Sequence, residues 1–158
     1  MKSTLIRVTL AGALAAAFSV PALAAEQGHE HAAANGAPLE LDHGRKWQTD
    51  EPLRKGMVEM RSALASELGA IHANQASEAQ YEALAAKLNG EVAYVVQNCK
   101  LEPRADAALH KVIAEVLAGA EAMQGREPGV ERREGAVRVA KALNAYGEYF
   151  DHPGWRDL

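Results

Sequence analysis

The sequence predicts an all-α protein, an antiparallel up-down-up-down four-helix bundle. In four stretches of about twenty residues, apolar side chains recur every three or four positions, which is the spacing of one helix face. Short segments containing Pro, Gly, Ser or Asn separate these stretches, and connections of a few residues favour antiparallel neighbours. We find no competing strand pattern along the chain.

The first helix is predicted over residues 50–72. Thr49 and Asp50 form a suitable helix start, and Pro52 falls in the first turn, where its missing N–H costs little. The apolar stripe of this helix contains Leu53, Met57, Met60, Leu64, Leu68 and Ile71. The steps of three and four residues between them predict one buried face.

The second and third helices are predicted over residues 78–99 and 103–124. Ser77 and Gln80 form a capping-box pair before the second helix, and Pro103 suits the first position of the third. The two apolar stripes contain Tyr81, Leu84, Leu88, Val92 and Val95, then Leu109, Val112, Val116, Ala120 and Met123. Both stripes predict helices that bury one face.

The fourth helix is predicted over residues 130–151, between a loop at 125–129 and the Pro153-Gly154 pair. Its apolar positions include Val139, Leu143, Tyr146 and Phe150. Four glycines stand alone inside helical patterns, namely Gly90, Gly119, Gly135 and Gly147. Each costs about 1 kcal/mol relative to alanine, so each is expected to mark a close helix contact or room for a ligand.

The first 24 residues predict a secretory signal peptide. Lys2 and Arg7 give it a basic start, and an apolar run too short for a membrane span leads to small residues around Ala24. We therefore expect a periplasmic protein with no stable membrane insertion after cleavage. The remaining parts are a flexible, histidine-containing segment (25–48), the bundle (49–152) and a C-terminal tail (153–158).

Composition and motifs argue against several functional classes. The chain has a formal net charge of −4 and no basic stripe, so nucleic acid is not an expected partner. Cys99 is the only cysteine, which excludes an intramolecular disulfide and covalent haem attachment. No catalytic motif occurs, so we expect no enzyme and no catalytic residues. Asp106 with His110, and Glu148 with His152, are spaced to form surface pairs that favour a charged histidine.

The stretches Leu53–Leu64 and Leu143–Tyr146 resemble the small soluble periplasmic cytochrome b bundles, whose architecture the wider cytochrome c-prime group shares. The resemblance covers residues 50–152. It implies a haem b between the helices, held by an early methionine and a late histidine. Met57 matches the methionine, whereas Gly147 occupies the histidine's position and offers no lone pair to iron. The resemblance thus implies a cofactor position at Met57 and Gly147. The missing histidine makes haem b a less expected cofactor than copper, which the residue types of the candidate metal ligands favour.

Candidate metal ligands lie in two places. His29 and His31 follow the predicted cleavage site, and their imidazoles suit Cu(II), Ni(II) or Zn(II). His43 is near enough in sequence to join them. Met57 and Met60 are spaced i, i+3, and their thioethers suit Cu(I). The alternatives are a solvated tail for the histidines and ordinary core packing for the methionines.

Three interpretations of function remain open. The first is an exported, non-catalytic binding protein whose ligand is a transition metal such as copper or a small molecule. The second is a haem-free, cytochrome-like bundle that acts as a protein-interaction or envelope stress accessory, with a surface such as Trp47 and residues 151–155. The third is a haem b electron-transfer protein with unusual ligation. The protein partner is unknown from the sequence.

Overall fold

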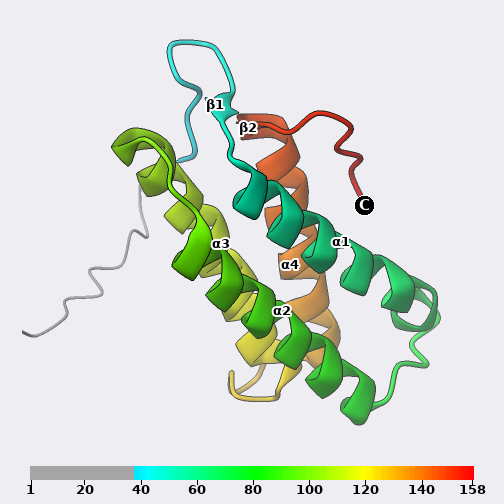
Figure 1. Cartoon of the computed structure of the whole chain (residues 1–158). Coiled ribbons are helices and arrows are strands. Elements are labelled where there is room, and N and C mark those ends of the chain that lie inside the picture. Colours follow the sequence, from blue (N-terminus) through cyan, green and yellow to red (C-terminus); the bar gives the residue numbers. More distant parts are fainter. Residues whose placement is uncertain (1–37) are drawn as a thin grey trace, which may run out of the picture. The chain divides into compact units, whose positions relative to one another are not determined.

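A computed structural model describes residues 38–158, which form four helices and one pair of short strands (Figure 1). The helices are α1 (Glu51–His72), α2 (Glu78–Asn98), α3 (Pro103–Met123) and α4 (Arg132–Tyr149). The strands are β1 (Trp47–Gln48) and β2 (Phe150–Asp151). The predicted four-helix, mostly helical fold is confirmed, and every helix begins and ends within about two residues of its predicted position.

Side chains cap three of the four helix starts. An Asp50 carboxylate oxygen accepts a hydrogen bond of 2.9 Å from the backbone N–H of Leu53 at the start of α1. Ser77 and Gln80 form the predicted capping box before α2, and Glu102 accepts from backbone N–H groups at the start of α3. These bonds satisfy N–H groups that have no partner inside the helix, so the starts are determined locally.

The strands form a parallel pair that joins the segment before α1 to the segment after α4. Trp47 pairs with Phe150, and Gln48 pairs with Asp151. Because two residues show no periodicity, no pattern in the sequence predicts this pair. Its formation ends α4 at Tyr149, so the prediction that residues 150 and 151 are helical is wrong.

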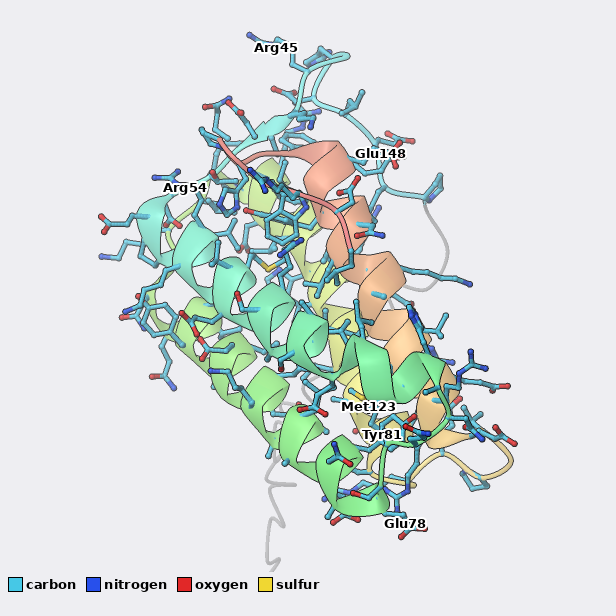
Figure 2. The ribbon with its side chains drawn as sticks, turned by 90° about the vertical axis from the view of Figure 1, so that its right-hand side faces the viewer. Arg45, Arg54, Glu78, Tyr81, Met123 and Glu148 are labelled. Atoms are coloured by element: carbon cyan, nitrogen blue, oxygen red, sulfur yellow. The ribbon has the colours of Figure 1, made fainter. Side chains whose placement is uncertain are left out.

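The core contains apolar side chains from all four helices, together with Trp47 and Phe150 from the strands. The largest fully buried side chains include Tyr146, Phe150, Leu53, Met57, Met60, Leu64, Leu109, Met123 and Leu143. Figure 2 shows Tyr81 and Met123 near one end of the bundle and Arg54 and Glu148 toward the other. Among residues 38–158, no helix combines the length and the apolar character that crossing a bilayer requires.

Two glycines bring the backbones of α3 and α4 together. A Cβ atom on Gly119 would lie 2.6 Å from the carbonyl oxygen of Gly135, and one on Gly135 would lie 2.5 Å from that of Gly119. The predicted close helix contact is therefore confirmed at both positions. A Cβ atom on Gly90 would meet nothing within 4 Å, so this glycine marks no helix contact.

Candidate functional site

Most of the side chains that carry chemistry gather at one end of the bundle, which we call the strand end. It comprises the strand pair, the start of α1, the loop between α2 and α3, and residues 152–158, which we call the strap. Figure 2 shows this end around Arg54 and Glu148. The candidate site is therefore built by segments from both ends of the described chain.

Asp50 joins the start of α1 to the end of α2. One carboxylate oxygen accepts from Leu53, and the other accepts a 2.6 Å hydrogen bond from the backbone N–H of Lys100. Burial alone would raise the pKa of Asp50. Hydrogen bonds from Lys100, Leu53 and the Cys99 thiol, together with the charge of Arg54, outweigh burial and hold this pKa below its ordinary value.

Cys99 is half-buried at the end of α2. Burial, and then the neighbouring Asp50 carboxylate, raises the pKa of the thiol to about 12. The thiol is therefore protonated at neutral pH, and it donates a hydrogen bond to Asp50. A protonated thiol is neither a nucleophile nor a good metal ligand. The structure thus gives Cys99 a packing and hydrogen-bonding role.

Replacing Asp50 with alanine should lower the free energy of unfolding by about 2 kcal/mol, because the helix cap and the bond to Lys100 are lost together. Asp50→Asn is the control, since it keeps an acceptor for the cap. In the natural protein the contribution is present above the ordinary pKa of 3.8 and is lost as the pH falls through the lower folded value. Urea unfolding of both variants measures the effect, and equal losses would contradict the capping role.

Tyr146 and His152 form a hydrogen-bonded pair between α4 and the strap. The Tyr146 hydroxyl lies 2.9 Å from Nδ1 of His152, and its fully buried ring stacks on Phe150 with ring centres 5.1 Å apart. Burial raises the pKa of Tyr146. Burial and the charge of Arg54 lower the pKa of His152, so a neutral imidazole accepts from a neutral phenol near pH 7.

The two predicted carboxylate–imidazole pairs have different outcomes. Nδ1 of His110 lies 3.4 Å from Oδ2 of Asp106 on the exposed surface of α3, as predicted. His152 lies beyond the end of α4 and bonds to Tyr146 instead of Glu148. The prediction of a charged His152 in a helical pair is wrong, because the chain leaves the helix before residue 152.

The strap returns from β2 over α4 and α1 (Figure 1). Arg61 on α1 donates to the carbonyl oxygens of Arg156 and Asp157. On α4, the amide oxygen of Asn144 accepts a 2.8 Å hydrogen bond from the backbone N–H of Leu158. The strap therefore bridges the two helices that carry Met57 and Gly147.

The indole of Trp155 covers Gly147. A Cβ atom at position 147 would overlap Cδ1 and Nε1 of this indole. The same indole meets the ring of Tyr146 edge-on, with ring centres 4.9 Å apart. The place that the resemblance assigns to a ligating histidine is thus filled by a side chain of the protein itself.

Met57 and Met60 lie in the core of the bundle. Both are 0% exposed and belong to the same buried apolar cluster as Tyr146. Gly147 follows Tyr146 on α4 but faces Trp155. The structure thus places the two thioethers together in the core, where methionine fills space between neighbouring side chains.

Of the candidate histidine ligands, the structure describes His43 alone. His29 and His31 lie outside the described residues. His43 lies at the tip of a hairpin turn with Gly44, and both have positive φ angles, of 50° and 81°. Its side chain is 78% exposed, and its Nε2 atom lies 3.4 Å from a guanidinium nitrogen of Arg104. In the part of the chain from residue 38 onward, no three His, Cys, Asp or Glu side chains are grouped to hold a metal ion.

An open cleft of about 480 Å³ lies between this hairpin and the α2–α3 loop. The Arg104 guanidinium lies over the Trp47 ring, 5.2 Å from its centre, and pairs with Asp42 at 3.1 Å. The lining also carries Lys100 and Glu102. Acidic and basic groups are therefore mixed in the cleft, which suits a small polar ligand better than a strongly charged one.

Sequence reasoning missed the contacts of Trp155 with Gly147 and of Asp50 with Cys99. Each joins residues from different segments, and no local spacing signals that the chain will bring them together. The isolated glycine at position 147 was the one signal that a close contact occurs there. Comparisons of the chain with protein-family models, with curated proteins and with solved structures found no match.

Proposed function

We propose that this chain is an exported, periplasmic and non-catalytic binding protein, built as an antiparallel up-down-up-down four-helix bundle without haem. The contact of Trp155 with Gly147 carries the haem-free part of the proposal. Glycine offers no lone pair to iron, and the indole occupies the space next to it. The short connections between helices support the antiparallel arrangement.

The protonation states at the strand end support a non-catalytic role. The Cys99 thiol has a pKa of about 12, so it is no thiolate nucleophile at neutral pH. His152 is held by the buried phenol of Tyr146. An imidazole engaged in this way is poorly placed to act as a general base toward a substrate.

We further propose that the ligand is a transition metal, copper in particular, and that His29 and His31 bind it with help from His43. The 78% exposure of the His43 side chain supports this part of the proposal, because an incoming ion can reach it from solvent. Met57 and Met60 are fully buried, so an ion could reach their sulfur atoms only by opening the core. The histidines are therefore the better candidates of the two sets.

Calorimetric titration of Cu(II) into the full chain tests this proposal. His29→Ala with His31→Ala should lower the affinity at least about tenfold, since two of the imidazole ligands are removed. Met57→Leu with Met60→Leu should leave it unchanged, because leucine keeps the packing and removes only the sulfur. His72→Ala is the matched control, as this exposed histidine ends α1 far from β1 along the helix.

Two results would overturn the metal proposal. The first is the absence of any stoichiometric Cu(II) binding by the natural protein. The second is an affinity that falls in the methionine double variant and not in the histidine one, since this would move the site into the core. Haem titration followed by visible spectroscopy tests the haem-free part separately, and a Soret band would contradict it.

A second candidate function is that of a protein-interaction or envelope stress accessory. One observation favours it: the buried indole N–H of Trp155 has no hydrogen-bond partner among residues 38–158. A buried donor without a partner is costly, and a partner protein that displaces the indole from Gly147 would satisfy it. Trp47, the other aromatic residue considered for such a surface, is only 6% exposed.

A further inference from the structure

We propose that the strap, residues 152–158, is a pH-responsive latch that opens when His152 takes up a proton. Opening detaches Trp155 from Gly147 and uncovers the face formed there by α1 and α4. The latch does not rest on the proposed metal function. Its test uses metal-free protein, so the two proposals can fail independently.

The strap is held by a few polar contacts and by the packing of Trp155 and Leu158 against the core. The imidazole of His152 bonds to Tyr146, Arg61 binds two carbonyl oxygens of the strap, and Asn144 binds Leu158. The indole N–H of Trp155 is buried and unpaired among residues 38–158, which weakens the closed state. A segment attached in this way opens far more easily than the helices beneath it.

The surroundings of His152 favour the neutral imidazole. Arg54 on α1 lies near it and adds a like charge if the ring is protonated. A proton on Nδ1 would also turn the acceptor of the Tyr146 bond into a donor. The phenol oxygen would then accept from the ring, and the buried phenol O–H would be left without its acceptor. Within the strap, the ring of Trp155 packs against the imidazole, with the two ring centres 5.1 Å apart.

Other charged groups also face this histidine. The shallow hollow that His152 shares with α1 is lined as well by Glu51, Arg54, Lys55 and Glu59. Glu59 is already paired with Lys87 at 3.4 Å, and Glu51 is exposed to solvent at the start of α1. The charge that acts most on His152 is therefore that of Arg54, and it opposes protonation.

The direction of the pH effect follows from linkage. Burial and Arg54 lower the pKa of His152 below its ordinary value of 6.5 in the closed strap, and opening restores the ordinary value. The open form therefore binds the proton more tightly, so the open-to-closed ratio rises as the pH falls through 6.5. Each unit between the two pKa values multiplies that ratio about tenfold, and the rise is complete below the pKa of the closed form.

Proton–nitrogen NMR of the full chain tests the latch, because its two tryptophans give two separate indole N–H signals. Between about pH 7.5 and about pH 5, the Trp155 signal should move to the position of a solvent-exposed indole. The Trp47 signal should stay, since its indole N–H donates a 2.8 Å hydrogen bond to the carbonyl oxygen of Glu40, which is not part of the strap. A Trp155 signal that does not move would overturn the proposal.

The variants separate His152 from other titrating groups. His152→Gln should abolish the movement of the Trp155 signal, whereas His110→Gln should keep it, because His110 is an exposed histidine on α3. If the strap of His152→Gln is already open at neutral pH, Arg54→Gln serves as the test of the latch instead, since it keeps the imidazole and removes the opposing charge. That variant should open less at low pH, and unchanged opening would contradict the latch.

Discussion

Replacing Gly135 with alanine should lower the free energy of unfolding by about 3 kcal/mol, at the upper end of typical overpacking costs. The new methyl group would lie 2.5 Å from the carbonyl oxygen of Gly119 and 2.7 Å from the backbone nitrogen of Met123. Both are backbone atoms, so α3 and α4 must move apart to accept it. Urea or thermal unfolding of the purified variant measures the loss.

Gly90→Ala is the matched control for this experiment. Its new methyl group meets nothing within 4 Å, so the better helix propensity of alanine should raise the free energy of unfolding by about 1 kcal/mol. The two identical substitutions should thus have opposite signs. A Gly135→Ala variant as stable as Gly90→Ala would contradict the close approach of α3 and α4.

Replacing Gly147 with histidine should also cost about 3 kcal/mol of stability, because the new side chain displaces Trp155 and the burial of its indole is lost. The strap should detach at every pH, with the Trp155 indole signal in its exposed position. We expect no haem spectrum on titration, because the closely packed core leaves no prepared pocket even when the indole is displaced. Unfolding, NMR and absorption spectra measure these three effects.

Glu148→His is the control, since it adds a histidine at the next position, where the side chain is exposed. It should change stability little and leave the strap closed. A Soret band from Gly147→His, together with none from the natural protein, would show that a cytochrome-like pocket is present and lacks only its ligand. Such a band would contradict our account of Trp155.

The helices could be predicted from the sequence because their determinants are local. The capping box at Ser77 and Gln80, the proline at position 103 and the apolar steps from Leu53 to Ile71 each act within one or two helical turns. These signals are complete before any helix meets another. The positions of the helices and their buried stripes were therefore determined by the sequence itself. The single cysteine likewise excludes an intramolecular disulfide.

The candidate site was decided by tertiary structure. The sequence marks Gly90, Gly135 and Gly147 alike, yet one lies in open space, one against another helix and one beneath Trp155. Strand pairing of Trp47 with Phe150 moves His152 off the helix, where Tyr146 and Arg54 determine its charge. Contacts between residues far apart along the chain depend on how whole elements pack, and no local pattern of residue types encodes that packing.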